Sequence, residues 1–108
     1  MVSQFEKEWL EMQDYIHGGN KTRGFWEEGV NRNQGECIAL MHSELSEVLE
    51  AIRSGNPPDP KVPTYSSVEV ELADTVIRIM DFAAAFGYAV AGAILEKVKY
   101  NKTRPYKH

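Results

Sequence analysis

The sequence predicts an all-α protein, an antiparallel bundle of about four helices in a single domain over residues 1–108. Three observations support this prediction. Apolar residues recur every three or four positions in separate segments, stretches rich in glycine or proline divide those segments, and no segment alternates between apolar and polar residues as a strand does. Because so short a chain buries a limited share of its surface, we also expect an oligomer.

The first predicted helix begins after Ser3, whose side chain would cap it, while Glu6 three residues later completes a capping box. Its apolar side chains keep helical spacing at Phe5, Trp9, Met12 and Ile16. The run His17-Gly18-Gly19-Asn20 is expected to end this helix, and residues 18–35 are expected to form a loop.

A second helix is predicted from about Asn33 to Arg53, where the run Ser54-Gly55-Asn56-Pro57-Pro58 stops it. Four prolines lie between residues 57 and 63, so the stretch up to Tyr65 is predicted to be an irregular linker. This linker is too rich in proline to pair as a strand.

Ser66 or Ser67 is expected to cap a third helix, which extends to about Phe86. Gly87 breaks that helix, and a fourth follows over about residues 88–101. Both helices carry more apolar and small residues than one small bundle needs, and small residues allow another helix to approach closely. We therefore predict a homodimer or a homotetramer.

Composition and charge exclude several classes of protein. A formal net charge of −4 argues against a general nucleic-acid binder, and the single Cys37 rules out an internal disulfide and a cysteine-rich zinc site. The first eight residues carry charges where a signal peptide has its apolar core, and the most apolar stretch, residues 82–95, is too short to span a membrane. We expect a cytoplasmic protein that binds neither nucleic acid nor membrane.

Acidic residues lie within otherwise apolar helix faces. On a wheel of the second helix, Glu44 falls inside the apolar arc and Glu47 on its border. The arc itself is predicted to be a core stripe, made of Ile38, Met41, Leu45, Val48, Leu49 and Ile52. The third helix is apolar nearly all round, and its charges crowd into a strip about 80° wide: Glu71, Asp74, Arg78 and Asp81. That strip faces either a thin window of solvent or an internal polar cavity.

These acids form two pairs of similar spacing, Glu44-Leu45-Ser46-Glu47 and Glu71-Leu72-Ala73-Asp74. Residues three apart share one helix face, so antiparallel packing of the two helices would bring four carboxylates around one small volume. Hard divalent cations would relieve their repulsion, and oxygen ligands suit Mg²⁺ or Mn²⁺. Asp81 would either extend this metal site or pair with Arg78.

The two motifs are followed by a basic segment, Lys97-Val98-Lys99-Tyr100-Asn101-Lys102-Thr103-Arg104-Pro105. In this order they resemble the MazG-like nucleoside triphosphate pyrophosphohydrolases of the all-α NTP pyrophosphatase superfamily, over roughly residues 24–107. The resemblance implies Mg²⁺-dependent hydrolysis of a nucleoside triphosphate, expected to be a deoxynucleotide, to the monophosphate and pyrophosphate. Clearing unwanted nucleotides from the pool is the role it implies.

Carried over residue by residue, the resemblance implies that four acids hold the Mg²⁺ ions: Glu44, Glu47, Glu71 and Asp74. Glu44 and Glu47 are the expected catalytic residues, and we assign Glu47 as the acceptor of the proton from the attacking water. Three further residues would hold the phosphates: Lys97, Asn101 and Arg104. For each of these three alone, a solvated surface position is the alternative.

Aromatic residues in the predicted loop have two interpretations. Trp26, with Phe25 beside it, would either stack on a nucleobase as a substrate-binding residue or plug the bundle or an oligomer interface. Trp9 and Cys37 are predicted to belong to the core. His42 is predicted to be a hydrogen-bonded histidine at the core edge of its helix.

Two other functions stay open. The chain would also suit a non-catalytic helical interaction or oligomerisation module, with its carboxylates in surface ion pairs, and such a module predicts neither nucleotide binding nor an effect of Mg²⁺ on stability. A phosphodiesterase or nuclease that uses the same metals suits the acidic body of the chain poorly.

Overall fold

The structure is a computed structural model that describes residues 2–27 and 32–105. Across these residues the chain forms four α-helices and no strand, which confirms the all-α prediction. The helices are α1 (Gln4–Thr22), α2 (Gln34–Arg53), α3 (Ser67–Phe86) and α4 (Val90–Asn101). The stretch between α2 and α3 is irregular, as predicted, apart from an isolated bridge between Pro58 and Ser66.

Side-chain caps set the N-termini of the first three helices. Ser3 Oγ accepts the backbone N–H of Glu6 at 3.1 Å, and the Glu6 carboxylate accepts the N–H of Ser3 at 3.2 Å, which confirms the capping box. Ser66 and Glu69 form the same reciprocal pair at the start of α3. Asn33 caps α2.

Two helix ends differ from the prediction. The expected end of α1 at residues 17–20 is wrong, because the helix continues through both glycines to Thr22, whose Oγ1 donates to the Gly18 carbonyl at 3.0 Å. The side chains of His17 and Asn20 form hydrogen bonds with Asp81 of α3, and these contacts hold the last turn of α1 in place. The break at Gly87 is confirmed, with φ of 75°, but α4 begins at Val90 rather than at residue 88.

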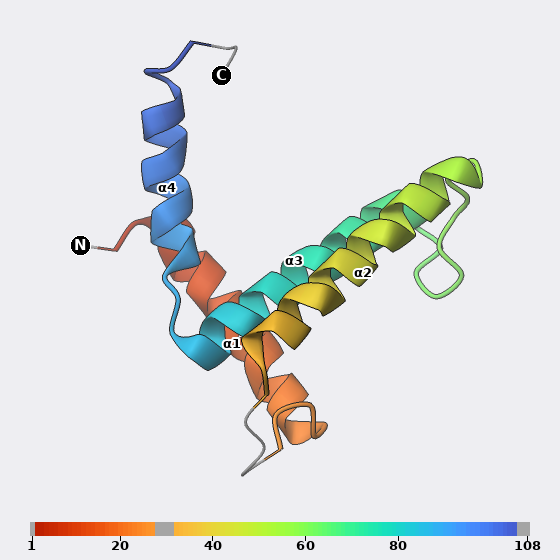
Figure 1. Cartoon of the computed structure of the whole chain (residues 1–108), viewed down its shortest axis with the longest axis horizontal. Coiled ribbons are helices and arrows are strands. Elements are labelled where there is room, and N and C mark those ends of the chain that lie inside the picture. The colour runs from red at the N-terminus through yellow and green to blue at the C-terminus, as the bar shows by residue number, and fades with distance from the viewer. Residues whose placement is uncertain (1, 28–31, 106–108) are drawn as a thin grey trace.

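The helices form two arms rather than one closed bundle (Figure 1). α2 and α3 lie side by side and antiparallel, and α1 crosses α3 near the end where α2 begins. At the left-handed Gly87 the chain turns, so that α3 and α4 are bent by 116° and α4 packs on α1. The α2–α3 pair and the α1–α4 pair therefore point in different directions.

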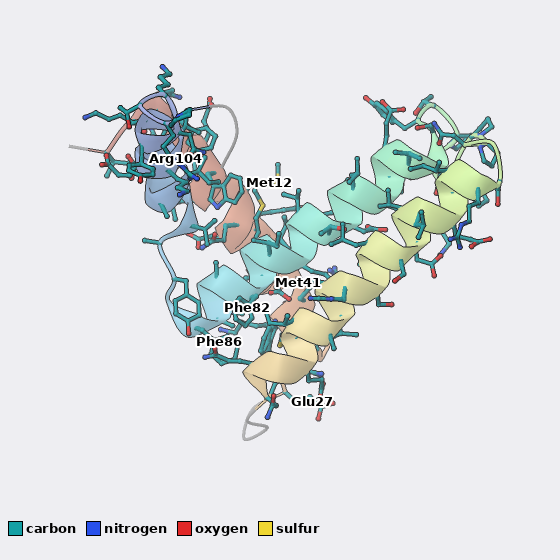
Figure 2. All side chains as sticks on the ribbon, turned by 45° about the horizontal axis from the view of Figure 1, so that its top comes forward. Met12, Glu27, Met41, Phe82, Phe86 and Arg104 are labelled. Carbon is teal, nitrogen blue, oxygen red and sulfur yellow. The ribbon has the colours of Figure 1, made fainter. Side chains whose placement is uncertain are left out.

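The core lies where α1, α2 and α3 meet. Phe82, Phe86 and Met41 all lie near this junction (Figure 2). The buried apolar residues are few and mostly small: Cys37, Ala51, Met80, Ala83 and Ala91. The predicted burial of Cys37 is confirmed, whereas Trp9 is only half-buried, with its indole N–H donating to Gln13 at 3.0 Å.

Large apolar side chains are widely exposed on the α2–α3 arm. The predicted core stripe of α2 is not covered within the chain, because Leu45, Leu49 and Ile52 are 48%, 49% and 59% exposed. On α3, Leu72, Val76 and Ile77 are exposed as well. Among the described helices, none is by itself long and apolar enough to cross a membrane; α3 and α4 meet that test only as a bent pair.

Candidate active site

Three of the four predicted carboxylates meet between α2 and α3. One carboxylate oxygen from each of Glu44, Glu71 and Asp74 lies within 4.8 Å of the other two. All three side chains are half-buried. We call these three residues the acid cluster. Glu47 is exposed and is not part of this closest group.

The local sequence explains why the acid cluster forms. Glu71 and Asp74 are three residues apart in α3, so one face of that helix presents both. α2 runs antiparallel beside this face and contributes Glu44 from the middle of its length. The three acids lie half-buried where the two helices meet, so water is partly excluded from them.

Burial and mutual repulsion disfavour the charged forms of Glu71 and Asp74. The pKa of Glu71 is raised above its usual value, first by burial and then by the neighbouring charges of Asp74 and Glu44. The pKa of Asp74 is also raised, by burial and by Glu44, and Arg78 partly offsets the increase. Arg78 Nε lies 3.2 Å from Glu44 Oε1, so one cation already balances part of the charge. A further cation would be favourable here.

An open recess of about 540 Å³ lies beside the acid cluster. Glu47, Glu71 and Asp74 line it, which places Glu47 on the same side of the molecule as the cluster. The linker between α2 and α3 also lines it, and its charged lining residues are Asp59 and Lys61. Sequence reasoning missed both, because it treated this segment as a spacer.

The linker residues have a defined conformation. Asp59 is buried, and its Oδ2 accepts the backbone N–H groups of Lys61 at 2.9 Å and Val62 at 2.8 Å. An aspartate that precedes a turn in this way is a recognisable signal in the sequence. It fixes the path of the linker, so that Lys61 lines the recess that contains two residues of the acid cluster.

A second recess of about 340 Å³ adjoins the cluster on the side of α1. Glu44 and Asp74 line it together with Arg78 of α3. The end of α1 and the segment after it contribute Asn20 and Phe25. The acid cluster therefore lies between two recesses, and their combined span is large enough for a small polar ligand.

The predicted phosphate-binding residues lie elsewhere in the chain. Lys97, Asn101 and Arg104 belong to α4 and the residues after it, and Figure 2 shows Arg104 on the arm away from the α2–α3 pair. Lys97 Nζ lies 4.8 Å and the Arg104 guanidinium carbon 5.5 Å from the ring centroid of Tyr100. The structure thus gathers these cations around one aromatic ring and does not bring them to the acid cluster of their own chain.

Trp26 occupies a half-buried position within an aromatic group. Its ring makes edge contacts with Phe25 and Phe86, at centroid distances of 5.1 Å and 5.8 Å. Its Nε1–H donates to both carboxylate oxygens of Asp81, at 2.9 Å and 2.8 Å. This arrangement favours the packing interpretation of Trp26 over stacking on a nucleobase. Phe25, rather than Trp26, lines the recess beside the acids.

Two other expectations need correction. Asp81 neither joins the acid cluster nor pairs with Arg78, because its oxygens are occupied by donors from α1 and the segment that follows. His42 is exposed rather than at the core edge.

Comparisons of this chain with protein-family models, with curated proteins and with solved structures gave no match.

Proposed function

We propose that this protein is a Mg²⁺-dependent nucleoside triphosphate pyrophosphohydrolase, which converts a triphosphate, by preference a deoxynucleotide, to the monophosphate and pyrophosphate. The observation that carries the proposal is the acid cluster, in which three carboxylate oxygens from two adjacent helices lie within 4.8 Å of one another beside an open recess. The resemblance of the two acidic motifs to the MazG-like enzymes supports the same activity.

The donor set of the cluster fits Mg²⁺ or Mn²⁺. All three residues offer carboxylate oxygens, which are the preferred ligands of hard divalent cations, and among the residues that the structure describes no histidine or cysteine belongs to this group. When bound, the metal would neutralise the triphosphate, polarise the α-phosphorus and lower the pKa of a coordinated water. The raised pKa values of Glu71 and Asp74 indicate that their negative charges are unfavourable in the cluster, and a cation would relieve this.

The chain's own residues have separate roles in this proposal. Glu44, Glu71 and Asp74 bind the metal, and Glu47, exposed at the edge of the same recess, completes the set and accepts the proton of the attacking water. Glu44, which is paired with Arg78, lines the second recess and is the other catalytic residue of this proposal. Lys61 supplies a positive charge on the wall of the recess, where a phosphate would lie.

The phosphate-binding role of Lys97, Asn101 and Arg104 requires an acid cluster other than that of their own chain. All three lie on the α4 side of the molecule. We propose that α4 of one copy approaches the recess of another, so that the site is shared between subunits. In this arrangement the acidic motifs of one copy and the basic motif of another act on the same substrate, although the two lie apart within one chain.

The size of the surface supports a homo-oligomer. The chain exposes 8088 Å², whereas a compact monomer of 12.2 kDa exposes about 6,100 Å². The difference, about 2,000 Å² per chain, matches what one subunit of an obligate dimer buries. The exposed apolar side chains of the α2–α3 arm include Leu45, Leu49 and Ile52 of α2 and Leu72 and Val76 of α3. We propose that a second copy covers this face, as a homodimer or as half of a homotetramer in the cytoplasm.

Release of pyrophosphate from common deoxynucleoside triphosphates, with Mg²⁺ and with EDTA, tests the proposal. Glu71→Gln should abolish release while leaving the helical content unchanged, because the substitution removes a charge and keeps the shape. Glu11→Gln is the matched control, since Glu11 is an exposed acid of α1 away from both recesses. Equal activity of wild type and Glu71→Gln would overturn the assignment.

A non-catalytic oligomerisation module is the second candidate, and the exposed apolar face of α2 and α3 favours it. A thermal-shift measurement separates the two functions. The enzyme should melt at a higher temperature with Mg²⁺ and a non-hydrolysable nucleotide, because both bind the native state. The module should show no change. Efficient cleavage of an oligonucleotide would instead indicate a nuclease.

A further inference from the structure

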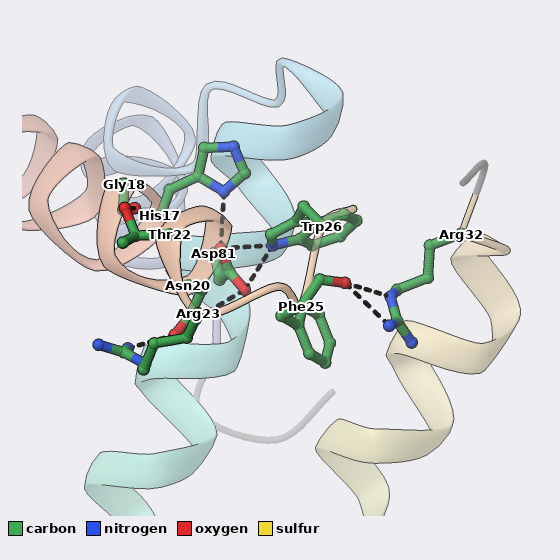
Figure 3. Close-up of polar contacts among 9 residues, drawn as sticks. All are labelled: His17, Gly18, Asn20, Thr22, Arg23, Phe25, Trp26, Arg32 and Asp81. Atoms are coloured by element: carbon green, nitrogen blue, oxygen red, sulfur yellow. Dashed lines mark hydrogen bonds and ion pairs between the residues drawn. The ribbon is translucent and has the colours of Figure 1, made fainter. Parts of the chain in front are cut away.

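Asp81 of α3 is a buried carboxylate that the proposed reaction does not use directly. Only 4% of its surface is exposed. His17 Nδ1 lies 2.7 Å from its Oδ1, Asn20 Nδ2 donates to its Oδ2 at 2.9 Å, and the Trp26 indole N–H donates to both oxygens (Figure 3). Because an ionised carboxylate only accepts, the Nδ1 of His17 carries the proton in this contact.

All three donors come from one stretch of chain, the end of α1 and the segment after it. A carboxylate this deeply buried is tolerated only when donors satisfy it, and here donors separated by more than fifty positions in the sequence do so. The consequence is a fixed connection between the end of α1 and α3. Asp81 thus determines where residues 17–26 lie.

The tethered stretch forms part of the wall beside the acid cluster. Asn20 and Phe25 line the recess of about 340 Å³ that also contains Glu44 and Asp74. Asn20 is held at both ends of its amide, since its Oδ1 accepts Arg23 Nη2 at 2.6 Å while its Nδ2 donates to Asp81. The orientation of Asn20 is therefore set by the Asp81 carboxylate.

Phe25 is also held by Arg32, a residue that does not contact Asp81. Arg32, just before α2, donates to the Phe25 carbonyl through Nη2 at 2.8 Å and Nε at 3.2 Å. Its guanidinium lies 4.0 Å from the centroid of the Phe25 ring. Asp81 fixes the neighbouring Trp26 to α3, so that Phe25 is fixed between two anchors (Figure 3).

We propose that Asp81 is a positioning residue of the nucleotide site, which holds Asn20 and Phe25 in place as the wall of the recess next to Glu44 and Asp74. This role rests on the proposed function. Asp81 also borders this recess, but His17, Asn20 and Trp26 occupy both of its oxygens. The residue therefore acts through the segment that it anchors and not by contacting substrate or metal. Its loss should therefore weaken substrate binding more than it slows the chemical step.

The kinetic test uses Asp81→Asn, which keeps the size of the side chain but replaces one acceptor oxygen with an N–H₂ group that faces donors. The KM for the triphosphate should rise about tenfold, the expected effect of losing a charged hydrogen bond, while kcat stays within about threefold of wild type. Trp26→Phe should change KM in the same direction. Trp9→Phe is the matched control, because the Trp9 indole donates within α1 to Gln13, and it should behave as wild type.

A spectroscopic readout accompanies the kinetics. The indole N–H resonance that disappears in Trp26→Phe belongs to Trp26, and it should shift in Asp81→Asn and stay unchanged in Trp9→Phe. A shifted resonance with a raised KM supports the positioning role. A shifted resonance with an unchanged KM overturns it and leaves Asp81 as a residue of the fold alone.

The remaining outcomes also test the positioning role of Asp81. A kcat that falls as much as kcat/KM overturns the positioning role, because the anchored wall should act on binding. If Asp81→Asn does not fold, Trp26→Phe decides, and a wild-type KM for that variant overturns the inference. Wild-type protein that releases no pyrophosphate refutes the proposed function, and the role of Asp81 with it, whereas an active wild type with an unaffected Asp81→Asn refutes the role alone.

Discussion

Asp74→Asn should make the metal-free protein more stable and at the same time remove its response to Mg²⁺. The acid cluster places three carboxylates within 4.8 Å, a distance at which two unit charges repel by about 0.9 kcal/mol in water and about 3.5 kcal/mol at an effective dielectric constant of 20. Removing one charge relieves repulsion with both Glu44 and Glu71. The attraction between Asp74 and Arg78 is lost in exchange.

The balance of these contributions is a net stabilisation of about 1–2 kcal/mol for the metal-free variant. For a domain of this size, that corresponds to a rise in Tm of about 4–8 °C per kcal/mol. Wild-type protein, in contrast, should gain about 1.4 kcal/mol from Mg²⁺ at ten times its Kd, because the ion binds only the native state. The Asp74→Asn variant lacks one ligand and should gain little.

Differential scanning fluorimetry in EDTA and in Mg²⁺ measures both effects in one experiment. Glu11→Gln is the control, since it removes one negative charge of α1 away from the cluster and should leave both melting temperatures close to wild type. The two expected changes have opposite signs, so general damage to the fold cannot produce them together. A lower Tm of Asp74→Asn in EDTA, with a wild-type response to Mg²⁺, would refute the metal site.

Three further predictions follow from the described contacts. The rise in Tm on adding Mg²⁺ should be larger at pH 8 than at pH 5, because protons compete with Mg²⁺ for the carboxylates at the lower pH. The raised pKa values of Glu71 and Asp74 have the opposite effect on the metal-free protein. The stability that their protonated forms contribute is present below about pH 4 and is lost as the pH rises through the raised values. Lys61→Ala should raise the KM for a triphosphate several-fold without changing the rise in Tm on adding Mg²⁺. The control is Lys21→Ala, which removes an exposed lysine of α1. Identical KM values for the two variants would exclude a phosphate contact of Lys61. Leu49→Glu should shift the mass measured by light scattering towards the monomer, because Leu49 is 49% exposed on the apolar face of α2; an unchanged mass would place the interface elsewhere.

Helix positions were predictable because their signals are local. The capping boxes at Ser3 and Ser66 and the left-handed Gly87 each act within a few residues. The end of α1 was not predictable in this way. Its two glycines suggest a stop, but Asp81, more than sixty residues from His17, holds the last turn. Contacts at such a separation leave no periodic pattern in one sequence.

In the candidate site, too, features set by helical spacing were predictable, whereas features set by packing or by the linker were not. The spacing of Glu71 and Asp74, together with the antiparallel packing of α2 and α3, was sufficient to predict that they meet Glu44. A helical wheel identifies an apolar arc but not what covers it, so the exposure of Leu49 was missed. Lys61 was missed because the conformation of its linker depends on the turn at Asp59, a feature that the run of prolines obscured.

The turn at Gly87 has a consequence for how the proposed enzyme would behave in a test tube. Because α3 and α4 diverge by 116°, a lone chain carries its carboxylates and its basic tail on separate arms. Turnover per chain should then fall on dilution, once subunits separate, even though each polypeptide stays chemically intact. Mixing a chain inactivated at Glu71 with one inactivated at Arg104 should restore part of the lost rate, since each variant supplies what the other lacks.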